Sequence, residues 1–85
     1  MKREYTGRDN YGRPKMDFVN RLRAMSDEDL FEETTKYIWM SGYANNNPRS
    51  DYHWMAGATY DEWGYRKKPG EYTRAYDQVH EEANR

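Results

Sequence analysis

The chain contains no cysteine and few branched aliphatic residues. The lack of cysteine excludes a disulfide framework and a thiolate zinc site, and two histidines leave little scope for another transition-metal site. A chain of 85 residues forms one domain, and one small core or a partner must stabilise it. The branched aliphatic residues are Val19, Leu22, Leu30, Ile38 and Val79.

Long apolar segments are also missing. No run approaches the roughly 20 apolar residues that span a membrane, and the N-terminal sequence "MKREYTGRDN" lacks the apolar segment of a signal peptide. We therefore expect a cytoplasmic protein that does not contact membranes.

Aromatic residues are abundant. The chain has nine tyrosines, three tryptophans and two phenylalanines. These rings are more than so small a core can readily bury, and Tyr and Trp are enriched where proteins meet one another. Some of them are therefore expected on the surface.

The charge is balanced overall and uneven along the chain. The net charge is −1, which excludes bulk attraction to a polyanion and the strongly negative charge of a DNA mimic. Residues 1–25 carry seven basic and three acidic groups, whereas residues 26–36 carry five acidic groups and one basic group. The acidic run can supply a local patch at most.

Start and stop signals predict an all-α fold, a small bundle of three to four helices with a flexible N-terminal arm. Residues 1–13 form this arm, or a wrap over the domain, and residues 14–85 form a single helical domain. Ser26 is a typical helix cap, Asn47 is the expected cap of the third helix, and prolines start helices well. The expected helices are residues 14–25, 27–44, 48–67 and a fourth that begins at Pro69.

Steps of 100° per residue give the second and third helices two distinctive faces each. The expected core stripes are Leu30, Thr34, Tyr37, Ile38, Ser41 and Ala44, then Tyr52, Met55, Ala56, Thr59, Tyr60 and Trp63. The opposite faces hold Glu32, Lys36, Trp39 and Tyr43, then Trp54, Ala58, Asp61 and Tyr65. Either the arm covers these second faces, with Tyr5 and Tyr11 as anchors, or their aromatic residues form an exposed contact surface.

Residue spacing argues against catalysis. His53 has Ala56 and Gly57 at the positions where a helical metal site needs ligands. Asp61 and Glu62 are adjacent, so their side chains point about 100° apart on a helix and do not form a catalytic pair. Glu62 has Arg66 four residues later, the spacing of an ordinary surface ion pair. With no nucleophile motif or phosphate-binding loop, we predict a protein that is not an enzyme and holds no metal or cofactor.

Two alternatives remain beside a protein-binding role. The arm alternates basic residues with tyrosines that could neutralise phosphates and stack on bases. Its candidate nucleic-acid-binding residues are Lys2, Arg3, Tyr5, Arg8, Tyr11, Arg13 and Lys15. The other alternative is a structural homodimer.

A pattern in the last two predicted helices resembles a known class. The pattern comprises Asp51-x-His53-x-x-Ala56, Tyr60-Asp61-Glu62, Arg66 and Tyr72-x-x-Ala75-Tyr76. It resembles small helical accessory proteins of bacteriophages and other mobile elements, the class to which anti-CRISPR proteins belong. The resemblance implies a cytoplasmic host-cell protein that inhibits a host defence (CRISPR-Cas) protein or ribonucleoprotein complex by occupying its surface.

We therefore predict stoichiometric protein–protein binding through aromatic anchors with an acidic rim. The predicted anchors are Trp39, Tyr43, Trp54 and Tyr65, and the predicted rim is Asp27, Glu28, Glu32 and Asp61.

Overall fold

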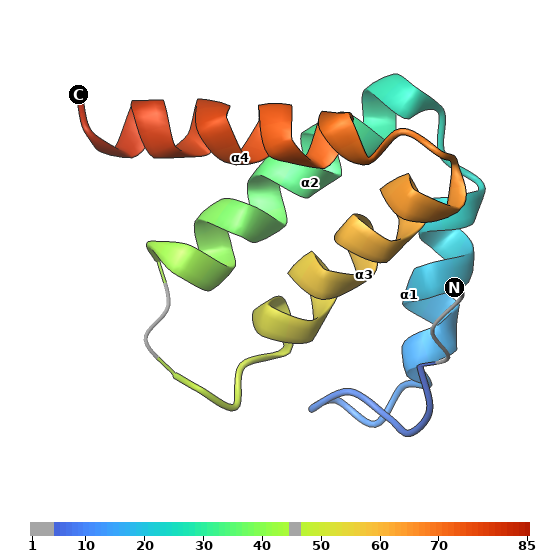
Figure 1. Cartoon of the computed structure of the whole chain (residues 1–85). Helices are drawn as coiled ribbons and strands as arrows, with labels where there is room; N and C mark the ends of the chain where they lie inside the picture. The colour runs from blue at the N-terminus through green and yellow to red at the C-terminus, as the bar shows by residue number, and fades with distance from the viewer. Residues whose placement is uncertain (1–4, 45–46) are drawn as a thin grey trace.

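The computed structural model describes residues 5–44 and 47–85 and contains four α-helices over this part of the chain. They are α1 (Lys15–Arg23), α2 (Asp27–Gly42), α3 (Asp51–Tyr65) and α4 (Pro69–Ala83). α3 lies between α1 and α2, and α4 crosses α2 and contacts α3 (Figure 1). The described residues form no strand, so the predicted all-α bundle is confirmed.

Two predicted helix starts are confirmed. The Ser26 hydroxyl accepts a hydrogen bond from the backbone N–H of Asp29 at 3.1 Å, which satisfies one of the unpaired donors of the first turn of α2. Pro69 is the first residue of α4, where its fixed φ suits a helix and its missing N–H costs nothing.

The predicted limits of the third helix are wrong at both ends. The Asn47 side chain accepts from the backbone N–H of Arg49 in a turn, and the cap is Ser50, whose hydroxyl accepts from the Tyr52 N–H at 3.2 Å. At the other end Lys67 adopts a φ of 62°. The N–H of Lys68 then bonds to the carbonyl of Trp63 at 2.9 Å, a Schellman ending that stops α3 at Tyr65.

The core lies where α1, α2 and α3 meet. Its largest fully buried side chains are Leu22, Leu30, Thr34, Thr59 and Trp63. A second cluster joins Ile38 of α2 to Ala75 and Val79 of α4. Two faces of α3 differ from the prediction: Tyr60 is exposed, and Ala58 on the opposite face is buried, because α1 packs on that side.

Residues 5–13 of the arm wrap against the helical domain. Gly7 and Gly12 both adopt a φ of 84°, which L side chains rarely reach, and Arg8 and Pro14 form an antiparallel bridge. The wrap is fastened to α3, since the Asn10 N–H bonds to the Asp51 carboxylate. The rest of the arm, residues 1–4, lies outside the described residues.

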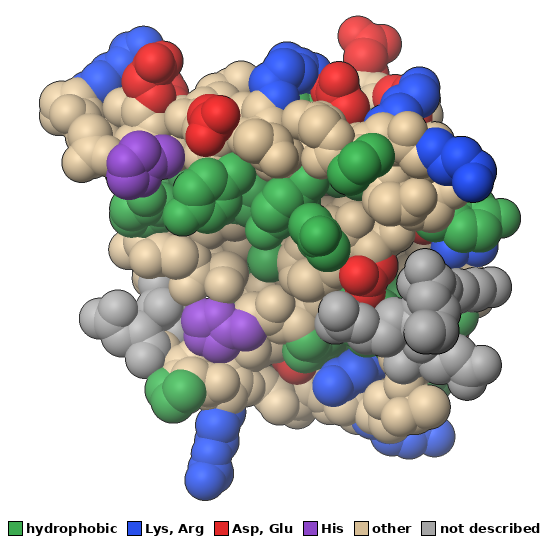
Figure 2. Space-filling model, in the orientation of Figure 1, with side chains coloured by type: hydrophobic (Ala, Val, Ile, Leu, Met, Phe, Trp, Pro, Cys, Tyr) green, Lys and Arg blue, Asp and Glu red, His purple; other side chains and the backbone are tan. Residues whose placement is uncertain are grey.

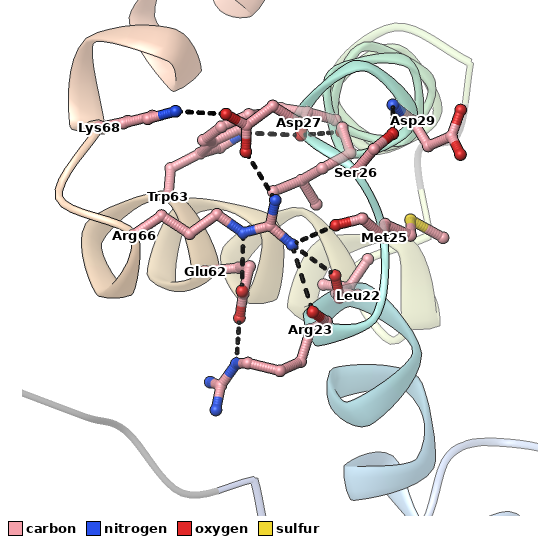
Figure 3. Close-up of polar contacts among 12 residues, drawn as sticks. Leu22, Arg23, Met25, Ser26, Asp27, Asp29, Glu62, Trp63, Arg66 and Lys68 are labelled. Carbon is pink, nitrogen blue, oxygen red and sulfur yellow. Dashed lines mark hydrogen bonds and ion pairs between the residues drawn. The ribbon is translucent and has the colours of Figure 1, made fainter.

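A partly buried arginine, Arg66, joins three helices at one end of the bundle (Figure 3). Arg66 donates from Nε to Glu62 at 3.0 Å and from Nη1 to Asp27 at 2.7 Å. Its Nη2 donates to the carbonyls of Leu22 at 2.9 Å and Met25 at 2.8 Å. The guanidinium therefore caps the C-terminal end of α1 and fastens it to α2 and α3.

Each carboxylate of this network also pairs with a second basic side chain. Glu62 is 2% exposed and also accepts a bond from Arg23 at 3.0 Å, so two guanidinium groups share one buried carboxylate. Asp27 pairs with Lys68, which follows α3. The predicted surface pair of Glu62 and Arg66 thus joins a buried carboxylate to a partly buried guanidinium, and both are held by groups about forty residues away in the chain.

Acid should weaken this end of the bundle. Hydrogen bonds from Lys68 and Arg66 lower the pKa of Asp27 below its usual value, so the folded protein binds fewer protons than the unfolded chain near that pH. The stabilisation is present above the unfolded pKa of about 3.9 and is lost as pH falls through the lower folded pKa.

We expect the free energy of unfolding to fall more steeply in the native protein than in Asp27→Asn between about pH 6 and about pH 3. Urea unfolding of both proteins at several pH values measures the difference. Parallel decreases would contradict the assigned role of Asp27.

Candidate functional site

Exposed aromatic rings gather on one face of the bundle, contributed by α2, α3 and α4. We call this surface the aromatic belt and define it as Trp39, Tyr43, Tyr60, Tyr72, Tyr76 and His80. Trp39 and Tyr43 come from the end of α2, Tyr60 comes from α3, and the other three follow one face of α4 at steps of four.

The rings of the belt form two contacting sets. Trp39 stacks on Tyr43, with centroids 5.4 Å apart, and the Tyr43 hydroxyl lies 2.8 Å from Nδ1 of His80. The His80 ring lies parallel to Tyr76 with centroids 6.4 Å apart. At the other end Tyr60 meets Tyr72 edge to face at 5.1 Å. Such packing holds the rings in defined positions, as a binding surface requires.

The belt holds most of the exposed aromatic surface of the described residues. Among the described residues six large hydrophobic side chains are exposed. Four of these six belong to the belt, and their exposed fractions are 41–53%. Figure 2 shows hydrophobic side chains in a band beside α4, with charged side chains above and below it. Exposed apolar patches of this kind mark interaction sites in proteins.

Trp54, one of the predicted anchors, does not join the belt. Its ring is half-buried on the other side of α3, with Phe18 at 5.4 Å and Tyr5 at 6.0 Å between centroids. Its indole N–H donates to Asp51 at 2.8 Å, and the Lys15 ammonium lies over the ring. The arm and α1 therefore cover this face of α3, and Tyr5 is an anchor as predicted, whereas the other predicted anchor, Tyr11, is 82% exposed.

The other predicted anchors and rim residues are dispersed. Trp39 and Tyr43 lie in the belt, whereas Tyr65 is exposed at the end of α3 beneath the Arg23 guanidinium, 3.7 Å from the ring centroid. Asp61 accepts a hydrogen bond from the Tyr5 hydroxyl. The remaining rim residues, Asp27, Glu28 and Glu32, line a groove between the first turns of α2 and α4. The structure does not bring the eight residues onto one surface.

The sequence analysis did not identify Tyr60, Tyr72, Tyr76 or His80 as site residues. It places Tyr60 on a core stripe, whereas Tyr60 is 53% exposed, and Tyr72 is partly buried against both core clusters. In α4 the signal was present: the line through Tyr72, Tyr76 and His80 is offset from the line through Ala75 and Val79, which are the buried residues of that helix.

The titratable groups of the belt are suited to binding. Burial raises the pKa of Tyr72, with a further contribution from Tyr76 and Tyr60, so its hydroxyl stays neutral.

His53, outside the belt, uses both of its ring nitrogens in hydrogen bonds. They lie 2.8 Å from the Ser41 hydroxyl and 2.8 Å from the Asn47 carbonyl. Over the described residues no group of three His, Asp or Glu side chains converges on a point.

The arm residues proposed for nucleic acid have local partners. Arg8 donates to the Gly12 carbonyl at 2.7 Å, and Arg13 lies 3.6 Å from the Asp9 carboxylate. Tyr5 is half-buried, and Tyr11 is the one arm tyrosine that is fully presented to solvent, at 82% exposure. Lys2 and Arg3 lie outside the described residues. The described cations of the arm therefore do not form a free basic stripe.

None of the helices described is both long and apolar enough to cross a membrane. The chain matches no protein-family model, no curated protein and no solved structure.

Proposed function

We propose that this protein works by stoichiometric binding to another protein and that the aromatic belt is its contact surface. The observation that carries the proposal is the gathering of six rings from three helices on one face, in two sets that contact within themselves and both border one pocket. Tyr and Trp supply large rigid contact areas, and few rotatable bonds are immobilised when they bind. The six belt side chains offer a large aromatic contact area, and none of them is an activated nucleophile.

The more specific form of the proposal is a phage-type accessory protein that inhibits a host defence complex, such as CRISPR-Cas, inside the host cell. The resemblance of residues 51–76 to that class supports it. Steric inhibition requires a rigid surface and a partner site to occupy, and the belt meets the first requirement.

Affinity capture tests the binding proposal. Tagged protein is used to capture partners from bacteria that carry an active defence system, and the same experiment is repeated with Trp39→Ala and Tyr76→Ala. Truncation of an interface anchor costs about 2 kcal/mol or more, so each variant should bind the captured partner at least about 30-fold more weakly. In cells, the native protein should restore phage plaques, and the belt variants should not.

Tyr65→Ala is the matched control, because Tyr65 is as exposed as Tyr76 and lies outside the belt. It should bind like the native protein. Loss of the partner in Tyr65→Ala and retention in both belt variants would refute the assignment. Salt-sensitive binding to mixed oligonucleotides would favour the arm instead, and a tight dimer broken by Tyr76→Ala would identify a second copy as the occupant.

A further inference from the structure

A small cavity opens within the aromatic belt, between α2, α3 and α4. Its volume is about 250 Å³. The described residues that line it are Ile38, Ser41, Gly42, Tyr43, Ala56, Tyr72 and Tyr76. Ile38 and Ala56 are buried, at 5% and 7% exposure, whereas Tyr43 and Tyr76 are about half-exposed. Three phenol rings therefore surround an aliphatic floor.

The lining is uncharged. None of these described residues carries an ionisable group that is charged near pH 7, so an ion that entered would lose water without gaining a counter-ion. Two of the hydroxyls are already engaged, that of Ser41 with His53 and that of Tyr43 with His80. An occupant of the cavity would therefore contact mainly the three tyrosine rings and the aliphatic side chains of Ile38 and Ala56.

The volume also limits the occupant. Pockets that hold drug-sized ligands occupy roughly 300–1,000 Å³, and this cavity is smaller. A single side chain is the appropriate size. Protein interfaces commonly place one anchor side chain in a pocket and surround it with contacts that exclude water, and the other belt rings are positioned to provide that surround.

We infer that this cavity is a socket for one uncharged aliphatic side chain, Leu, Ile or Met, that projects from the partner protein. The inference rests on the proposed role of the belt and adds the chemistry of the partner. None of the four acidic residues predicted as the rim lines the socket, so the predicted acidic rim does not surround this part of the contact surface.

Small probes test the socket without knowledge of the partner. ¹⁵N-labelled full-length protein is titrated with N-acetyl-leucinamide and, separately, with tetramethylammonium chloride, which probes a cation-binding aromatic cage. The leucine probe should shift the amide resonances of Ile38, Ser41, Gly42 and Ala56 saturably, with a Kd on the order of 10 mM, as expected for so few atoms. Tetramethylammonium should bind at least about 10-fold more weakly.

Variants locate the response. Tyr76→Ala removes one wall of the socket and should weaken the leucine probe at least about 5-fold, whereas Tyr65→Ala should leave its Kd unchanged. The absence of saturable shifts, or a preference for tetramethylammonium, would overturn the socket. Either result can occur while partner capture still depends on Trp39 and Tyr76, so failure of the socket is distinguishable from failure of the proposed function.

Discussion

Arg66→Ala should lower the free energy of unfolding by roughly 3–5 kcal/mol, because it removes a charged partner from the buried carboxylate of Glu62. The substitution would leave Glu62 buried with Arg23 as its remaining cationic partner. It would also leave the carbonyls of Leu22 and Met25 without the donor that now caps α1. Burial disfavours the charge of Arg66, but hydrogen bonds to Glu62 and Asp27 outweigh it and raise its pKa, so the network depends on the guanidinium at every ordinary pH.

Urea unfolding followed by circular dichroism measures this loss. Arg13→Ala is the control, because Arg13 forms an exposed ion pair with Asp9 and should change stability by no more than about 1 kcal/mol. Arg66→Lys keeps the charge but loses the planar set of donors, so its stability should lie between those of the native protein and Arg66→Ala. If Arg66→Ala does not fold, Arg66→Lys still reports the effect. Equal stability of Arg66→Lys and the control would refute the role of the network.

The helical architecture was predictable because its signals are local. Ser26 and Pro69 act on the first turns of their own helices, and the spacing of Leu30, Thr34 and Ile38 records which side of α2 is buried. The start of α3 was missed because two capping residues, Asn47 and Ser50, compete within four positions. A hydrogen bond from Arg49 engages Asn47 in a turn and leaves Ser50 as the cap.

The site was less predictable because exposure depends on neighbours that are distant in the sequence. Composition correctly indicates that some rings lie on the surface, but periodicity gives the direction of a side chain and not what covers it. Trp54 and Tyr76 illustrate this limit. The arm and α1 cover Trp54, whereas no described residue covers Tyr76 beyond half of its surface. The same limit made Glu62 and Arg66 resemble a surface pair.

Trp63→Ala is the second substitution with a large expected effect. Trp63 is completely buried, and its indole N–H donates to the Thr34 hydroxyl at 2.9 Å. That hydroxyl donates in turn to the Leu30 carbonyl at 2.6 Å, so the tryptophan joins α3 to the first half of α2. Loss of the ring should cost roughly 3–5 kcal/mol, since the removed surface and the remaining cavity both contribute.

A smaller substitution separates packing from hydrogen bonding. Trp63→Phe keeps most of the apolar volume and removes the N–H, while Thr34 can still donate to Leu30; its cost should therefore be no more than about half that of Trp63→Ala. Urea unfolding gives both values, and equal losses would show that the hydrogen bond dominates over packing.

The two Trp63 variants also connect the core to the belt. Tyr43 and Tyr60 project from the two helices that Trp63 holds together, so a cavity between α2 and α3 should loosen the spacing of the belt rings. Trp63→Phe should bind the partner or the leucine probe nearly as well as the native protein. Trp63→Ala, studied where it is still folded, should bind more weakly although none of its belt residues has changed. Full binding by Trp63→Ala would mean that the belt does not depend on the α2–α3 contact and that α4 alone positions its essential rings.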